Sequence, residues 1–228
     1  MSTPSYPEGM NAVDASIQDA RFVRTREQLR KAVLQLAISR SISTISVADL
    51  TRQAGVNRAT FYNHADSPSQ LLEAALLEDL DSIRAEFLES TSAENMTFEQ
   101  IWRQAVNETV EHVSRFEQVY LRGFSDDSDG TLQNLLSKHI AKSMIQLFDQ
   151  NPLLLPESQP ESKDFLKDAY ASAIAAALTA ILGVWIRTPE RDLEAYVAAV
   201  LNVLPAWMHD SKTKDLSKEG HSESLDNR

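Results

Sequence analysis

Cysteine is absent from the 228-residue sequence, which excludes disulfide bonds, thiolate metal sites and cysteine nucleophiles. Glycine occurs only six times and at scattered positions, so the chain contains neither a phosphate-binding loop nor a dinucleotide-binding fingerprint. A G-x-S-x-G motif is also missing, and the five histidines lack the spacing of metal ligands. We therefore expect no catalytic site, no metal and no cofactor. A helical enzyme using buried carboxylates is the remaining catalytic alternative, and the sequence offers no constellation for it.

The sequence also has little that would direct it to a membrane or out of the cell. Its first 20 residues have no basic start and no apolar run, unlike a secretory signal. The most apolar stretch, ASAIAAALTAILGVWI at residues 171–186, is rich in alanine and shorter than the roughly 20 residues needed to cross a bilayer. We expect a buried helix there, in a cytoplasmic protein with no membrane partner.

Positive charge is scarce overall but concentrated in one segment. The formal net charge is −11. Between residues 21 and 65, however, eight Lys and Arg residues stand against two acidic ones, a charge of +6, so the rest of the chain carries −17. This asymmetry predicts one anion-binding module attached to an acidic, soluble body.

Apolar residues recur at helical spacing along nearly the whole chain, which predicts an all-α protein. The last expected helix contains Pro205, where we expect a kink. The patterns predict helices at residues 24–39, 47–54, 58–64, 68–87, 97–124, 132–149, 163–187 and 188–209.

Four segments follow from this order of elements. The polar ends are expected to be disordered. The expected segments are a disordered arm at 1–20, an N-terminal three-helix module at 21–66, a larger helical domain at 67–209 and a disordered tail at 210–228.

Two short helices joined by a tight turn characterise residues 46–64. Ser46 and Asp49 form a capping-box pattern, Gly55 suits a left-handed cap, and Asn57 can cap the second helix. This is the helix-turn-helix arrangement, in which the second helix enters the major groove of DNA and the first braces it. A solvated helix in an ordinary helical bundle is the alternative. The residues expected to be buried are Val47, Leu50, Ala54, Val56, Phe61 and Ala65.

The outward-facing residues of the second helix suit DNA recognition. Arg58 can donate two hydrogen bonds to guanine, and Asn63 can pair with adenine. Thr60 and Ala59 can contact a thymine methyl group, whereas hydroxyl groups such as that of Tyr62 can bind phosphates and fix register.

The segment ISVADLTRQAGVNRATFYNHADSPSQLLEAAL, residues 45–76, resembles the signature of the TetR family of bacterial transcriptional regulators. The later segment GVWIRTPERDLEAYVAAVLNVLPAW is similar to the closing helix pair of that family. The resemblance implies a DNA-binding regulator in which recognition-helix residues meet DNA and the start of the preceding helix contacts phosphate. It implies a DNA-binding set of Ser46, Val47, Arg58, Ala59, Thr60, Tyr62, Asn63 and His64.

Two positions depart from the family pattern. Ala65 stands where an aromatic residue is usual, and Pro68 stands where a lysine usually neutralises a phosphate. Loss of that lysine should lower the salt dependence of DNA binding by about one unit. These departures leave open a second interpretation, a TetR-fold ligand-sensing or interaction protein whose operator recognition is weak or lost.

The resemblance further implies that the larger domain binds a small-molecule effector and forms a homodimer through its last two long helices. It implies a regulator of a double-stranded DNA operator. Repression relieved by ligand is the commoner mode in the family, and activation, or ligand-promoted DNA binding, is the alternative. Aromatic, sulfur-containing and basic residues of this domain could line the effector cavity. The candidates are Trp102, His112, Arg115, Phe116, Tyr120, Phe124, Met144, Phe148 and Tyr170.

Overall fold

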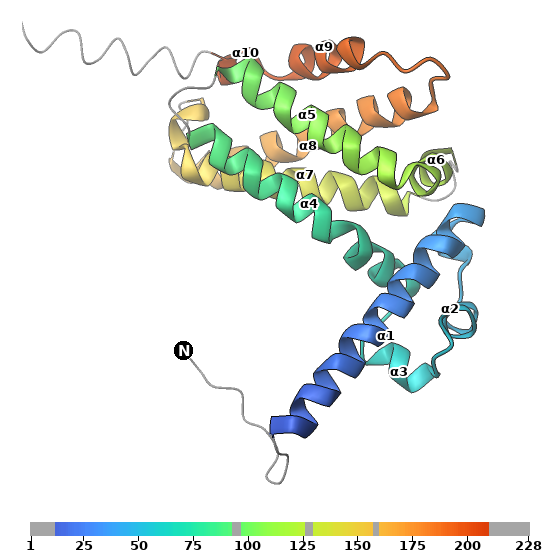
Figure 1. Cartoon of the computed structure of the whole chain (residues 1–228). Helices are drawn as coiled ribbons and strands as arrows, with labels where there is room; N and C mark the ends of the chain where they lie inside the picture. Colours follow the sequence, from blue (N-terminus) through green and yellow to red (C-terminus); the bar gives the residue numbers. More distant parts are fainter. Residues whose placement is uncertain (1–11, 93–96, 126–129, 157–159, 210–228) are drawn as a thin grey trace, which may run out of the picture. The chain divides into compact units, whose positions relative to one another are not determined.

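The computed structural model describes residues 12–92, 97–125, 130–156 and 160–209 (Figure 1). Within these ranges every regular element is a helix, which confirms the predicted all-α class. Contacts between Cα atoms divide the chain into two compact units, Met1–Leu76 (unit 1) and Leu77–Arg228 (unit 2). The division falls inside a long helix, whereas the sequence places the domain boundary at residues 66–67, just before that helix.

Unit 1 has a core between its first helix and the two short helices that follow. Leu29 and Val33 of the first helix, with Leu50 and Phe61 of the short helices, have no exposed surface. Their burial confirms the predicted apolar stripe. The elements of this unit are α1 (Ala12–Ser39), the 3-10 turn η1 (Ile42–Thr44), α2 (Val47–Ala54), α3 (Arg58–Tyr62) and the first turns of α4 (Pro68–Ser92).

Local signals determine where the short helices begin and end. The Ser46 hydroxyl accepts a hydrogen bond from the Asp49 N–H at 3.1 Å, and the Asp49 carboxylate accepts one from the Ser46 N–H at 3.3 Å. The predicted capping box is therefore present. Helix α2 ends at Gly55, whose φ of 67° is a conformation that other residues rarely adopt. The Asn57 side chain then accepts from the Thr60 N–H at 2.8 Å and caps α3.

Helix α1 begins earlier than its apolar pattern predicts. It starts at Ala12, whereas the pattern predicts a helix only from residue 24 and a disordered arm over 1–20. The intervening sequence, AVDASIQDARFV, contains neither glycine nor proline and includes several alanines, so nothing in it stops a helix. The expectation of disorder is wrong for residues 12–20. Residues 1–11 and the predicted tail, 210–228, lie outside the described ranges.

Unit 2 contains the rest of α4 and the remaining helices. Helices α7 and α8 run side by side, α9 packs on both α8 and α5, and α6 packs on α7 and α8 (Figure 1). The elements are α5 (Phe98–Arg115), α6 (Glu117–Ser125), α7 (Thr131–Gln150), the 3-10 turns η2 (Pro152–Leu154) and η3 (Pro160–Ser162), α8 (Lys163–Arg187), α9 (Leu193–Val203) and α10 (Ala206–His209).

Two helices of unit 2 differ from their sequence patterns. The pattern predicts one helix over 97–124, but the chain leaves helical geometry at Phe116 and resumes at Glu117. Both halves bury residues in the same core, so the apolar spacing does not reveal the break. The closing helix starts after an Asp192 cap rather than at Thr188, and it ends at Val203 because Pro205 cannot continue the hydrogen-bond ladder.

Small residues of α8 allow α6 to approach it closely. A Cβ atom added at Gly183 would lie 2.6 Å from the Phe124 ring. In the same region the Arg187 guanidinium donates to the Phe124 carbonyl oxygen at 2.6 Å. These contacts hold the end of α6 against α8.

Helix α8 is long and apolar enough, by length and composition alone, to cross a membrane. A core helix of a soluble protein has the same properties, and 44% of the apolar window is buried inside the protein. Ala171 and Ala175 have no exposed surface where α8 packs in unit 2. Helix α8 therefore buries one face in unit 2, as predicted, whereas Ala173, Ala176, Ala180 and Val184 on its other face are exposed.

Candidate nucleic-acid interface and effector cavity

Helix α3 is oriented by the side chain it buries. Phe61 has no exposed surface and lies in the core of unit 1, so the opposite side of this short helix faces outward. Arg58, Ala59, Tyr62 and Asn63 are exposed. The structure thus presents on one surface the arginine, tyrosine and asparagine that the sequence singles out.

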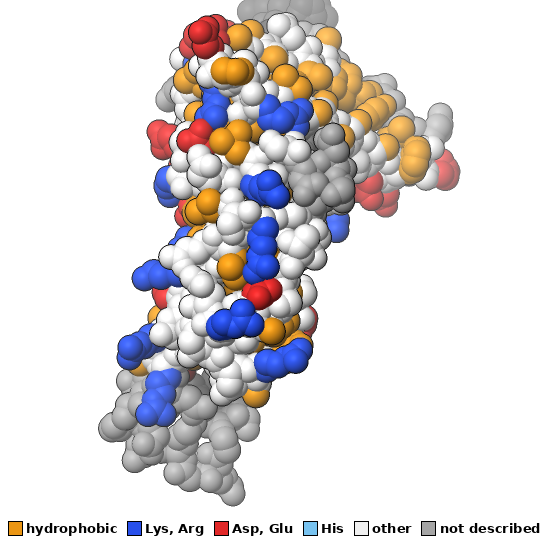
Figure 2. Space-filling model, turned by 90° about the vertical axis from the view of Figure 1, so that its right-hand side faces the viewer, with side chains coloured by type: hydrophobic (Ala, Val, Ile, Leu, Met, Phe, Trp, Pro, Cys, Tyr) orange, Lys and Arg blue, Asp and Glu red, His pale blue; other side chains and the backbone are white. Residues whose placement is uncertain are grey.

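The surface of unit 1 around these residues is basic. Figure 2 shows Lys and Arg side chains spread over this unit, in the lower part of the view, with few acidic side chains among them. Among the eight basic residues of the segment, Arg30 and Arg40 are half-buried. The exposed ones are Arg21, Arg24, Arg26, Lys31, Arg52 and Arg58.

Thr60 is partly engaged by the helix cap. Its hydroxyl donates to the Asn57 side chain at 3.0 Å, and its backbone N–H donates to the same oxygen. The methyl group of Thr60 and the hydroxyl lone pairs remain for an outside partner, whereas the hydroxyl proton is already used.

His64 lies just after α3 and packs on α1. Its ring stacks on that of Phe22, with centroids 4.1 Å apart and planes at 26°. Burial, together with the charge of Arg26, lowers the pKa of His64 below its ordinary value. His64 is therefore a neutral, half-buried contact between α1 and the end of α3. Phe22 is missing from the sequence-based site, because only the helical fold of residues 12–23 brings it here.

Ser46 and Val47 begin α2, as expected. The Ser46 hydroxyl donates to the Asp49 carboxylate at 2.8 Å, so its proton is used within the capping box. Hydrogen bonds from Ser46, with the charge of Arg40, lower the pKa of the Asp49 carboxyl group. Arg40 and Arg52 both pair with Asp49, at 3.1 and 3.4 Å. The acidic residue at this edge is therefore largely neutralised.

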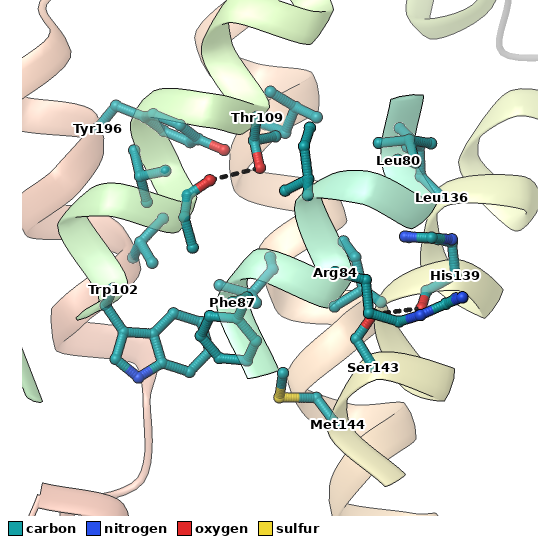
Figure 3. Close-up of a pocket in the computed structure, with 17 residues that line it drawn as sticks. Leu80, Arg84, Phe87, Trp102, Thr109, Leu136, His139, Ser143, Met144 and Tyr196 are labelled. Carbon is teal, nitrogen blue, oxygen red and sulfur yellow. Dashed lines mark hydrogen bonds between the residues drawn. The ribbon is translucent and has the colours of Figure 1, made fainter. Parts of the chain in front are cut away.

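A cavity of about 100 Å³, partly open to solvent, lies among the helices of unit 2 (Figure 3). Among the residues proposed from sequence for an effector, Trp102 and Met144 line it. Tyr196 and Arg84 also line it, and no sequence pattern pointed to either residue. They reach the same space only because α4 and α9 both border it.

The other sequence candidates occupy different places in unit 2. The buried ring of His112 hydrogen-bonds through Nε2 to the Tyr120 hydroxyl at 2.6 Å. Arg115 pairs with Asp79 at 3.2 Å, and the rings of Phe116 and His112 have centroids 5.1 Å apart. These residues join α4, α5 and α6 rather than lining the cavity.

The remaining aromatic candidates pack against other rings and helices. Phe124 contacts α8 at Gly183 and is nearly fully buried. Phe148 and Tyr170 both contact the Trp207 ring, with centroids 6.1 and 5.4 Å from it. Within the described ranges, no group of three or more His, Asp or Glu residues is placed to hold a metal ion.

Comparison with known proteins gives a short sequence match and a longer structural one. No protein-family model matches the chain. A 59-residue segment, 25% of the chain, is 42% identical to the uncharacterized HTH-type transcriptional regulator YxbF of Bacillus subtilis. That segment spans 16% of the length of YxbF.

Two solved structures resemble most of the chain. The dihydroxyacetone kinase operon activator DhaS matches 83% of this chain and 97% of its own, with 19% identity and a TM-score of 0.50. A TetR transcriptional regulator from Streptococcus agalactiae matches 82% of this chain and 97% of its own, with 20% identity and a TM-score of 0.51. The chain has the fold of the TetR-family transcriptional regulators, as the resemblance of residues 45–76 predicts.

Proposed function

We propose that the chain is a sequence-specific, DNA-binding transcriptional regulator whose operator binding is controlled by a small-molecule effector. The observation that carries this proposal is the exposed surface of α3. There Arg58, Tyr62 and Asn63 are exposed, while Phe61 on the other side of the helix is buried in the core of unit 1. The surrounding segment carries a charge of +6, which suits the phosphate backbone of DNA.

Each exposed residue has a role that its chemistry supports. Arg58 is the first residue of α3, forms no ion pair with any described residue, and would read guanine. Asn63 would read adenine, and Ala59 with the Thr60 methyl group would contact thymine. The Tyr62 hydroxyl would donate a hydrogen bond to a phosphate. The Ser46 hydroxyl would do the same after giving up its hydrogen bond to the Asp49 carboxylate.

His64 and Val47 have supporting roles in this proposal. The His64 ring, stacked on Phe22, would hold the end of α3 in place and meet the DNA with its outer edge. Val47 is half-buried at the start of α2 and would place that helix end against the backbone of the duplex.

Control by an effector would act through α4. Leu80 and Phe87 of this helix line the cavity of unit 2, while Leu71 and Leu72, earlier in the same helix, are buried in unit 1. A ligand that binds one position of α4 more tightly than another would shift the DNA-binding unit toward the position it favours. The size of this shift in population is set by the difference between the two ligand affinities. We propose repression relieved by ligand in the cytoplasm. DhaS is named an activator, so transcription with and without the ligand decides the sign.

A homodimer through α8 and α9 completes the proposal. Small and apolar residues form an exposed row along α8 at helical spacing: Ala173, Ala176, Ala180 and Val184. Val203 adds exposed apolar surface on α9. Pairing these helices across a twofold axis would form a four-helix bundle and place two α3 helices in successive major grooves, about 34–36 Å apart.

Selection of bound fragments from sheared genomic DNA tests the proposal. The expected result is enrichment of a roughly palindromic site that the protein binds at least about a thousandfold more tightly than random DNA. Equal, weak binding to every fragment would instead favour a TetR-fold sensor without operator recognition. Pro68, in place of the usual lysine, is the feature that favours this second function.

A further inference from the structure

The walls of the cavity in unit 2 are mainly apolar. Phe87 and Trp102 meet edge to face with ring centroids 5.1 Å apart, and Met144 lies beside them (Figure 3). An engineered apolar cavity of about 150 Å³ is known to hold benzene. The space here, about 100 Å³, is smaller, so it limits the enclosed part of a ligand to a compact group no larger than one small ring.

The two aliphatic hydroxyls in the walls have already used their protons. The Thr109 hydroxyl donates to the Ala105 carbonyl at 2.7 Å, and the Ser143 hydroxyl donates to the His139 carbonyl at 3.0 Å (Figure 3). Each of these bonds joins two residues of the same helix. These hydroxyls therefore offer a ligand only lone pairs.

Tyr196 differs from these residues. It is 95% buried, lines the cavity, and points its hydroxyl from α9 toward Thr109 (Figure 3). The hydroxyl forms none of the hydrogen bonds found among the described residues. Burial raises the pKa of Tyr196, so the hydroxyl stays protonated. The hydroxyl faces the cavity as a donor that no described protein group uses, so an acceptor on a ligand can receive its proton.

The charges at the cavity wall balance one another. The Arg84 guanidinium pairs with Asp81 at 2.7 Å, and the Arg84 side chain is only 14% exposed. His139 Nδ1 lies 3.7 Å from the same carboxylate. Burial and the charge of Arg84 lower the pKa of His139, which keeps its imidazole neutral at neutral pH. An ionised ligand would therefore meet no uncompensated opposite charge.

The opposite face of Tyr196 is fixed by packing. Its ring stacks on Trp185 with centroids 4.9 Å apart and planes at 23°. The Trp185 indole N–H donates to the Asp192 carbonyl at 3.2 Å, and Arg191 covers the indole. Replacing Tyr196 by phenylalanine would preserve this stack and remove only the hydroxyl.

We propose that the cavity binds a small, neutral molecule, whose apolar part is on the order of one ring and whose single hydrogen-bond acceptor receives the proton of Tyr196. This inference deepens the proposed effector control and rests on it for its biological meaning. The binding itself is measurable on the free protein, without DNA.

Three probes with the same ring separate the possible ligand classes. The full chain is titrated with cyclohexanone, cyclohexane and cyclohexanecarboxylate by ligand-detected NMR. Cyclohexanone is expected to bind at least tenfold more tightly than the carboxylate, because the carboxylate loses its hydration without gaining a free cation. Equal or tighter binding of the carboxylate would overturn the proposal, as would no binding of any probe.

Two variants identify the donor. Tyr196→Phe is expected to weaken cyclohexanone binding roughly three- to tenfold, the effect of one lost hydrogen bond, and to leave cyclohexane binding unchanged. Thr179→Val is the control, because it removes a hydroxyl that is buried without a partner and does not line the cavity. An unchanged cyclohexanone affinity in Tyr196→Phe would overturn the role of Tyr196. A failed operator search would leave these titrations unaffected, so the two proposals fail separately.

Discussion

The ring of His64, which follows α3, stacks on Phe22 of α1 at a centroid distance of 4.1 Å. Phe22 is 48% exposed and precedes the apolar stripe that forms the core side of α1. Helix α1 therefore contacts the end of α3 outside the core of unit 1 as well as within it.

We predict that Phe22→Ala destabilises the protein by about 0.5–1.5 kcal/mol, the range for a stacked ring pair. Urea unfolding followed by circular dichroism measures the change. Val23→Ala is the matched control, since Val23 is 61% exposed and should change stability by less than about 0.5 kcal/mol. Equal effects of the two substitutions would show that the stacked ring contributes nothing specific.

The buried His112 should make stability depend on pH. Burial lowers its pKa to about 4 from the ordinary 6.5, because the charged ring is poorly accommodated. As pH falls below 6.5 the unfolded chain binds the proton first, so the unfolding free energy falls until about pH 4. The contribution of neutral His112 to the unfolding free energy is fully present above pH 6.5.

Between pH 7 and pH 5 we expect this group to remove roughly 2 kcal/mol of stability. Comparing wild type with His112→Gln isolates the effect, since both proteins share the titration of their carboxylates. The variant should lose less stability than the wild type over this interval. Identical pH dependence in urea unfolding would contradict the assignment.

Substitution of Gly183 should lower the stability of the protein, because an added side chain would clash with the Phe124 ring. An added methyl group would lie 2.6 Å from the ring, so we expect Gly183→Ala to cost about 1–3 kcal/mol of stability. At Gly130 the nearest atom to an added Cβ is 3.6 Å away. Gly130→Ala is therefore the control, and thermal unfolding should leave it close to wild type. If Gly183→Ala unfolds like this control, α6 and α8 are less tightly packed than described.

The exposed row on α8 predicts a dimer that a single charge disrupts. Val184→Glu would place like charges near the twofold axis, and we expect it to shift the protein to a monomer in sedimentation velocity. Val23 is equally exposed, at 61%, but lies in unit 1. Val23→Glu should therefore remain dimeric. A dimer that survives Val184→Glu would place the interface elsewhere.

Local signals made much of the fold predictable. The capping boxes at Ser46 and Thr97 and the glycine at 55 place helix ends, because each depends on residues three or four apart. Helix α8 begins and ends at residues 163 and 187, as its pattern predicts. The break at Phe116 was not predictable, because apolar spacing continues through it.

The candidate sites were predictable to different degrees. The α3 surface follows from a compact motif in which Phe61 alone sets the buried side. The cavity depends on helices brought together from distant segments. The candidates chosen from sequence therefore include Trp102 but neither Tyr196 nor Arg84. Residues such as His112 and Tyr120 instead pair with each other in the core.

The most direct test of the account is fluorescence-anisotropy binding of a selected genomic fragment by wild type, Arg58→Ala and Arg122→Ala. Arg122 is an exposed arginine of α6, so its removal changes the net charge equally without touching α3. We predict that Arg58→Ala weakens specific binding by about 1–3 kcal/mol, roughly 5- to 150-fold, while Arg122→Ala stays within about twofold. Equal affinities for wild type and Arg58→Ala would contradict the claim that α3 reads the operator.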